Sequence, residues 1–273
     1  MIHRCIDPVA LALTAPGAPF ETVRGTNGEV FRNIPHNLSD LYRAAQRHGA
    51  RRMLQTEQVA YSYDDVFAFA ARVARALTDE FGVKRGDYVA MAMLSGVEWM
   101  ACFIAVHAVG ATAAMVNTRC APDEMIHAIG QVGARLVIAD GLRAAALQTE
   151  QASQGWRMIV SGAPDRVRGE KDRDLAAILA QASEISFDPV DRASDNAAIV
   201  LFTSGTTGRP KAVRLDDAAM THAVGVAGLA GAIQDQRYQM EFGRKIPPGR
   251  GSAESATIIA GPVFHFSGIM PFL

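Results

Sequence analysis

Cysteine is scarce in this chain of 273 residues. Cys5, Cys102 and Cys120 lie at wide and unrelated spacings, whereas disulfide frameworks and zinc sites need cysteines in paired or regularly spaced sets. Residues 1–15 also lack the unbroken apolar core of a secretion signal, because Asp7 and Pro8 interrupt them. We therefore expect a cytoplasmic protein without disulfides, in which Cys102 is a buried thiol.

Long hydrophobic runs and an excess of either charge are missing as well. The longest apolar stretch, residues 99–116, is interrupted by His107 and Gly110 and is rich in small residues, so we expect no membrane span. The 27 basic and 28 acidic residues give a formal net charge of -1, which indicates neither nucleic acid nor an anionic membrane as a partner. A composition that is 49% hydrophobic excludes disorder and leaves small-molecule chemistry as the default function.

Short apolar segments alternate with helical patterns over the first two thirds of the chain. The apolar segments have the length of buried strands, and the amphipathic segments between them repeat with a helical period. This alternation predicts an α/β fold of mostly parallel sheets layered with helices. We expect strands at residues 88–94, 111–116, 135–139 and 157–160, helices at 38–48, 62–81, 97–109, 122–130, 142–151 and 172–182, and a hairpin at 52–62.

The apolar periodicity lapses between residues 183 and 195, where Phe187-Asp188-Pro189 indicates an extended connection. We place a boundary here, with one α/β subdomain at residues 1–190 and the start of a second at residues 191–273. The second region begins with a short apolar strand at 197–202.

A helix is expected at residues 218–233, followed by a long surface loop at 234–252 that combines charge with prolines and glycines. Within the helix Gly225, Gly228 and Gly231 lie three residues apart. A dinucleotide fingerprint would place its glycines in the turn after a strand, so this row indicates close helix packing instead.

The segment richest in chemistry is Phe202-Thr203-Ser204-Gly205-Thr206-Thr207-Gly208-Arg209-Pro210-Lys211, directly after the apolar strand. Glycines let backbone amides converge on an anion, hydroxyl groups donate further hydrogen bonds, and a lysine adds a compact positive charge. On the residues alone, a polar hairpin without a ligand is an equal alternative. The candidate phosphate-binding residues are Thr203, Ser204, Gly205, Thr206, Thr207, Gly208 and Lys211.

This segment is not a Walker loop. Arg209 and Pro210 separate Gly208 from Lys211, and no Ser or Thr follows the lysine. Residues 212–215 are compatible with a strand, and the residue before a proline avoids the helical region. The pattern therefore predicts strand, loop and strand.

Residues 202–211 resemble the signature phosphate loop of the adenylate-forming superfamily, which includes acyl-CoA synthetases, peptide-synthetase adenylation domains and firefly-type luciferases. Residues 262–268, Pro-Val-Phe-His-Phe-Ser-Gly, resemble the family's Pro-Leu-Phe-His-x-x-Gly element. Upstream, residues 86–90, Gly110-Ala111 and Asn117 resemble the family's Rossmann-like N-terminal region. The resemblance thus spans nearly the whole chain and implies that residues 1–190 are Rossmann-like and that residues 191–273 carry the phosphate loop.

The resemblance implies a two-step reaction. The carboxylate of a small-molecule acid attacks the α-phosphate of ATP to give an acyl-adenylate and pyrophosphate, and coenzyme A then displaces AMP. The seven loop residues would hold the β- and γ-phosphates, and Mg²⁺ would be held mainly through those phosphates. His265 would line the junction of the acyl and nucleotide pockets, although a lone His between Phe264 and Phe266 also fits a packed core histidine.

Two departures from the family pattern stand out. Family members continue with Lys-Gly-Val and a His, whereas this chain has Lys211-Ala212-Val213 and then Asp216-Asp217. Two carboxylates near a triphosphate would be mildly unfavourable. In addition, the family's adenine, ribose and magnesium elements and its mobile C-terminal domain would lie beyond residue 273.

We therefore expect an N-terminal fragment of an acyl-CoA ligase, with an incomplete second subdomain and an absent C-terminal domain. Such a fragment would be inactive and poorly soluble alone, and its partner would be the missing part of the same enzyme. The alternatives are a non-catalytic nucleotide-binding module and an adenylation domain that loads a carrier protein. The sequence does not identify the acid.

Overall fold

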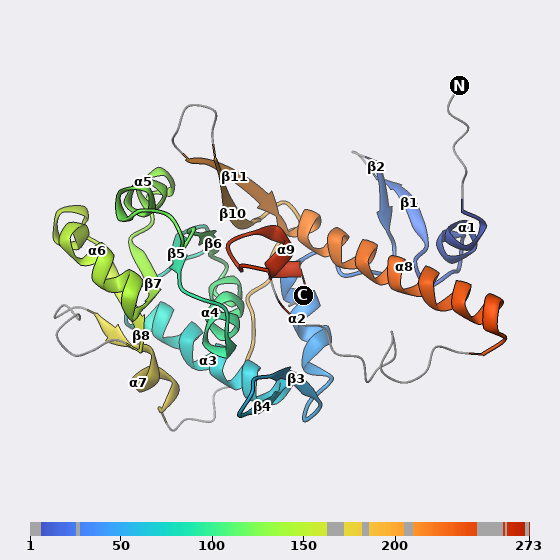
Figure 1. Cartoon of the computed structure of the whole chain (residues 1–273), viewed down its shortest axis with the longest axis horizontal. Helices are drawn as coiled ribbons and strands as arrows, with labels where there is room; N and C mark the ends of the chain where they lie inside the picture. The colour runs from blue at the N-terminus through green and yellow to red at the C-terminus, as the bar shows by residue number, and fades with distance from the viewer. Residues whose placement is uncertain are drawn as a thin grey trace.

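The computed structural model describes residues 7–25, 28–162, 172–181, 186–204, 210–244, 259, 261–270 and 273. Within this part of the chain, the centre of the molecule is a seven-stranded sheet of order β11-β10-β6-β5-β7-β8-β9 (Figure 1). All neighbouring strands are parallel except β10 and β11. The expected mostly parallel α/β sheet is confirmed. Its strands are β5 (Tyr88–Ala92), β6 (Thr112–Met115), β7 (Leu136–Asp140), β8 (Arg157–Ser161), β9 (Arg173–Asp174), β10 (Ala197–Ser204) and β11 (Pro210–Asp216).

Both faces of the sheet are covered by helices. Along β5, Val89 and Met91 belong to one buried cluster and Ala90 and Ala92 to the other, as the two-residue period of a strand requires. One cluster lies under α3 (Tyr63–Asp79) and α4 (Val97–Ala108), and the other under α5 (Pro122–Val132) and α6 (Gly141–Gln154). Burial on both faces explains why these strands are continuous apolar runs rather than alternating ones.

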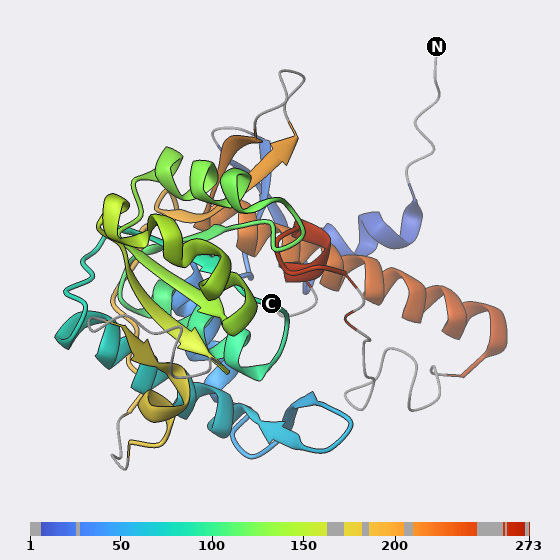
Figure 2. The same ribbon diagram turned by 60° about the vertical axis from the view of Figure 1, so that its left-hand side comes forward.

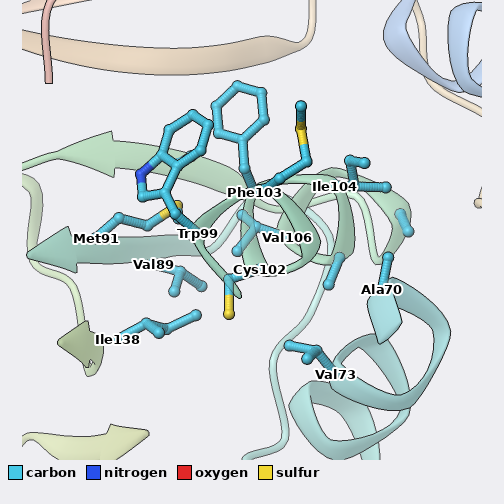
Figure 3. Close-up of a cluster of buried hydrophobic side chains, with 14 of the residues drawn as sticks. Ala70, Val73, Val89, Met91, Trp99, Cys102, Phe103, Ile104, Val106 and Ile138 are labelled. Carbon is cyan, nitrogen blue, oxygen red and sulfur yellow. The ribbon is translucent and has the colours of Figure 1, made fainter. Parts of the chain in front are cut away.

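Helix α4 is the centre of the larger cluster. Every residue from Trp99 to Ala108 is buried, and Figure 3 shows α4 side chains directed towards Val89 and Ile138 of the sheet and towards Val73 of α3. The Trp99 and Phe103 rings stack with their centroids 4.8 Å apart. A helix that is apolar all round is buried inside a protein. The burial of α4 therefore accounts for the long apolar run, and no membrane span is needed to explain it. Within the described residues no helix is long and apolar enough to cross a membrane.

The short elements before α3 follow the sequence pattern. Helix α2 (Leu38–Gln46) begins at an Asn37 cap. The expected hairpin is formed by β3 (Arg52–Gln55) and β4 (Ala60–Ser62), and the capping box of Ser62 with Asp65 starts α3. The last helix of the series, α7 (Leu175–Leu179), is shorter than the range expected for it.

Helix α8 (Asp217–Phe242) is longer than the sequence indicated. The prediction of a surface loop from residue 234 was wrong for its first part, because the helix continues to Phe242. Figures 1 and 2 show α8 projecting from the sheet, with α1 (Pro8–Thr14) alongside it. A hairpin of β1 (Thr22–Gly25) and β2 (Gly28–Phe31) also packs on α8.

The glycines of α8 make close packing possible, as predicted. A Cβ on Gly225 would lie 2.5 Å from the Phe31 ring, and one on Gly228 would lie 3.1 Å from the Phe20 ring. Gly231 differs, because a Cβ there would meet no atom within 4 Å. The division of the chain at residue 190 stays a prediction; β10 and β11, which follow it, join the same sheet as the strands that precede it.

Candidate functional site

The predicted phosphate segment begins and ends in an antiparallel pair of strands. Thr203 on β10 pairs with Lys211 on β11, and Ser204 pairs with Pro210. The Thr203 hydroxyl donates a long hydrogen bond of 3.5 Å to the Lys211 carbonyl. The two strands predicted on either side of the segment are confirmed. The structure therefore brings Thr203 and Lys211 together, whereas Gly205, Thr206, Thr207 and Gly208 lie outside the described residues.

β10 leads into the predicted phosphate segment at the carboxyl edge of the sheet, where the parallel strands end and where ligands bind in open α/β folds. Because β10 runs parallel to β6 and β5, Ser204 lies at the same edge as the carboxyl ends of these strands. Both Thr203 and Lys211 have exposed side chains. A hydroxyl and an ammonium group are thus available to an anion at this edge.

The neighbouring loops at this edge are held by Asp140, which the sequence analysis did not single out. The Asp140 carboxylate accepts hydrogen bonds from the backbone amides of Leu94 and Arg143, each at 3.1 Å. The Arg143 guanidinium in turn donates to the Thr118 carbonyl at 2.9 Å. These bonds join the loops after β5, β6 and β7. The available signal was an Asp directly between a buried strand and a helix, a typical helix cap.

Helix α5 contacts the hairpin where β11 begins. The side-chain amide of Gln131 donates a 2.8 Å hydrogen bond to the Pro210 carbonyl. The same amide nitrogen lies 2.8 Å from Nε2 of His127, one turn earlier. No motif in the sequence marks Gln131, because the contact joins segments 79 residues apart.

Asp216 and Asp217 are well separated from Lys211. Asp216 is the last residue of β11 and lies roughly 17 Å from Lys211 at the rise of an extended strand. Asp217 follows it as the first residue of α8. Asp216 caps α8 by accepting from the Ala219 amide at 2.8 Å. The Asp217 side chain is fully buried and forms an ion pair of 2.8 Å with Arg192. The two carboxylates therefore do not lie beside Lys211.

The Arg192–Asp217 pair belongs to a buried polar network. Arg192 also donates to the carbonyls of Ala111 at 3.0 Å and Ala197 at 2.7 Å, and Asp217 accepts from the Leu38 amide at 3.0 Å. These bonds give the buried guanidinium and carboxylate groups their hydrogen-bond partners. The start of β10, the strand that leads to the phosphate segment, is fixed by these contacts.

The second motif forms a tight turn before the short helix α9 (Phe266–Ile269). A Cβ on Gly268 would lie 2.2 Å from the Pro262 carbonyl oxygen, so only glycine fits there. His265 is exposed, whereas Phe264 is buried in the core cluster. The alternative of a packed core histidine is therefore excluded, although within the described residues no hydrogen bond joins the His265 side chain to Thr203 or Lys211.

Neither a thiol nucleophile nor a metal cluster is formed by the described residues. Burial raises the pKa of Cys102 far above its usual value and raises that of Cys120 to about 11. Within the same residues no group of three His, Cys, Asp or Glu side chains is placed to hold a metal ion. Among the described residues, the groups exposed at this edge include the Thr203 hydroxyl and the Lys211 ammonium group.

A mostly parallel sheet covered on both faces defines an α/β protein. In this class ligands bind at the carboxyl ends of the parallel strands, the edge at which Thr203 and Lys211 lie. The chain matches the AMP-binding enzyme family over residues 41–272, and it belongs to that family. The resemblance to adenylate-forming enzymes and the expected mostly parallel α/β fold are both confirmed.

Three similar proteins illustrate the relationship. The chain is 27% identical to the 3-hydroxybenzoate–CoA ligase of Aromatoleum sp. (strain CIB), over 68% of this chain and 33% of that protein. It is 30% identical to the medium/long-chain-fatty-acid–CoA ligase FadD6 of Mycobacterium tuberculosis, over 68% of this chain and 29% of that protein. The crystal structure of ATP-bound MatB from Rhodopseudomonas palustris matches with a TM-score of 0.65 at 25% identity, over 87% of this chain and 42% of that one. The chain thus spans about a third of the length of the curated relatives that it matches.

Proposed function

We propose that the whole protein activates a carboxylic acid with ATP and transfers the acyl group from AMP to coenzyme A. The observation that carries the proposal is the antiparallel hairpin that places Thr203 beside Lys211 at the ligand-binding edge of the sheet. The relatives named above are ligases of an aromatic and of a fatty acid, so the acid itself stays open. The part of the enzyme described above would be inactive without the remainder of the fold.

In this proposal the chain's own groups bind and orient phosphates. Lys211 supplies a fixed positive charge, and Thr203, Ser204, Gly205, Thr206, Thr207 and Gly208 supply hydroxyl and backbone donors for the β- and γ-phosphates. The exposed hydroxyl of Thr203 and the exposed ammonium group of Lys211 fit such a ligand. Mg²⁺ would be coordinated mainly by the phosphates of ATP.

His265 is proposed to line the junction between the acyl and nucleotide pockets. Its exposure and its place at the start of α9 support this role, because its ring is free to contact a ligand. Phe264 and Gly268, on either side of His265 in the chain, are buried, so the turn that carries the imidazole packs against the core.

Product analysis separates this function from its two alternatives. The intact enzyme should release pyrophosphate from ATP only when its acid is present, and should form a thioester with coenzyme A. Thioester formation only on a carrier protein would instead indicate an adenylation domain. ATP binding without acid-dependent pyrophosphate release across a panel of aromatic and fatty acids would indicate a non-catalytic module.

The Lys211→Ala variant tests the site directly. We expect the KM for ATP of the intact enzyme to rise about 10- to 100-fold, which corresponds to the loss of a charge-assisted hydrogen bond. Arg214→Ala is the matched control, because Arg214 is an exposed cation on the same strand but three residues further from the loop. Equal ATP affinity in wild type and Lys211→Ala would contradict the assignment of the phosphate loop.

A further inference from the structure

We propose that Gln131 is a positioning residue for Lys211, and that it acts by holding the peptide group between Pro210 and Lys211. The inference rests on the proposed function of the hairpin and adds to it a residue on a different helix. Gln131 lies on α5, outside both motifs that suggested the site.

The contact is made where the sheet supports the chain from one side only. β11 is at the edge of the sheet, pairs with β10 alone and begins at Pro210, which has no backbone N–H group to donate. The Gln131 amide donates to the Pro210 carbonyl at 2.8 Å, so α5 adds a second anchor. This hydrogen bond fixes the first residue of β11 where the chain leaves the predicted phosphate loop.

The anchored carbonyl belongs to the same planar unit as the Lys211 amide nitrogen. Because the peptide bond is planar, holding the Pro210 oxygen also sets the direction from which the Lys211 Cα atom continues. On the other side, Lys211 is paired with Thr203 of β10. The backbone of Lys211 is therefore held from β10 and from α5, and its side chain starts from a defined position.

A second hydrogen bond fixes the orientation of the Gln131 amide. A carbonyl oxygen only accepts, so the amide nitrogen of Gln131, and not its oxygen, must face Pro210. That nitrogen is also 2.8 Å from Nε2 of His127, which accepts a hydrogen bond in this arrangement. His127 and Gln131 are four residues apart on α5 and face the same side. If the amide rotated by half a turn, its oxygen would oppose the Pro210 carbonyl.

The effect is expected in ATP binding rather than in overall stability. Gln131 is exposed, and an exposed neutral hydrogen bond contributes little to folding. Gln131 holds the peptide group that precedes the Lys211 Cα atom. Loss of this hydrogen bond would therefore allow the Lys211 side chain to adopt more orientations. A purely structural role would instead change the melting temperature and all kinetic constants together.

The test compares Gln131→Ala and Gln131→Glu with wild type in the intact enzyme, measuring KM for ATP, KM for the acid, kcat and melting temperature. We expect KM for ATP to rise about 3- to 10-fold in Gln131→Ala, because one neutral hydrogen bond is lost. The increase should be larger in Gln131→Glu, because an ionised carboxylate has no hydrogen to donate to Pro210. KM for the acid and the melting temperature should stay unchanged. Gln154→Ala is the matched control: Gln154 lies on α6, lines the same surface hollow as Gln131 and has no side-chain hydrogen bond within the described residues.

An unchanged KM for ATP in both Gln131 variants would overturn the inference, and so would parallel changes in kcat, both KM values and melting temperature. The Lys211→Ala variant distinguishes the two levels of the proposal. If Lys211→Ala weakens ATP use and the Gln131 variants do not, only the role of Gln131 fails. If Lys211→Ala has no effect, the phosphate-loop assignment fails and the role of Gln131 fails with it.

Discussion

At the scale of single residues, His107 shows how burial fixes a protonation state. Its ring is fully buried, and burial followed by the nearby charge of Arg192 lowers the pKa to about 3. Nε2 lies 2.9 Å from the Ala198 carbonyl and must donate to it, so Nδ1 accepts from the Tyr42 hydroxyl at 2.9 Å. Burial raises the pKa of the Tyr42 hydroxyl, which stays protonated as this bond requires.

This assignment predicts a loss of stability in mild acid. In the unfolded chain a histidine binds a proton near pH 6.5, whereas folded His107 does so only near pH 3. Between these values the unfolded state binds more protons, so stability falls as the pH decreases. From pH 7.5 to pH 5 the free energy of unfolding should fall by about 2 kcal/mol through this group.

Urea unfolding of wild type and His107→Gln at the two pH values checks the prediction. Glutamine keeps a donor and an acceptor but does not titrate, so the variant should lose about 2 kcal/mol less than wild type between the two pH values. Equal losses in both proteins would mean that His107 titrates alike in the folded and unfolded states.

Residue-level predictions from sequence succeeded where a motif has a local cause. The buried Cys102 was predictable because a thiol in an apolar run is usually internal. The contacts of Asp217 and Gln131 were not, because their partners lie 25 and 79 residues away in sequence. Hydrophobic periodicity carries no signal for contacts between residues so far apart in the sequence.

At the scale of elements, the glycines of α8 provide an internal comparison. Replacing a glycine by alanine in a helix usually stabilises it by about 0.5–1 kcal/mol. Gly231→Ala should follow this rule, since its new Cβ meets nothing within 4 Å. Gly225→Ala should instead destabilise the protein by about 1–3 kcal/mol, because its Cβ would lie 2.5 Å from the Phe31 ring.

Thermal melts of the two variants beside wild type are sufficient to test this difference in sign. The wild-type melting temperature should lie between those of Gly225→Ala and Gly231→Ala. A rise in both variants would mean that the Phe31 ring moves aside without loss, and that β2 is not closely packed on α8.

The extent of α8 also shows where element prediction fails. The alternation of strands and helices was predictable because buried strands are short apolar runs bounded by turns. The last part of α8, by contrast, is polar on most sides, as in Gln234 to Gln239, and such a segment resembles a surface loop in composition. Its continuation to Phe242 was not marked by any apolar stripe, and α1, β1 and β2 were not expected at all.

At the scale of the whole molecule, the Arg192–Asp217 pair joins regions on both sides of the boundary proposed at residue 190. Asp217 begins α8 and accepts from the Leu38 amide at the start of α2, and Arg192 donates to the Ala111 carbonyl before β6. Both side chains are fully buried. The two proposed regions should therefore unfold together rather than independently.

Arg192 and Asp217 should be energetically coupled. Removing one partner leaves an uncompensated charge in the interior, so Asp217→Asn or Arg192→Met alone should lower the free energy of unfolding by about 3–5 kcal/mol. The double variant should cost less than the sum of the two, because the stranded charge is gone. The exposed pair Arg75–Asp79 is the control, and Arg75→Met should change stability by less than about 1 kcal/mol. Additive losses in the Arg192 and Asp217 cycle, measured by urea unfolding, would show that the two side chains stabilise their surroundings separately, and the proposed joint unfolding of the two regions would then lack its main contact.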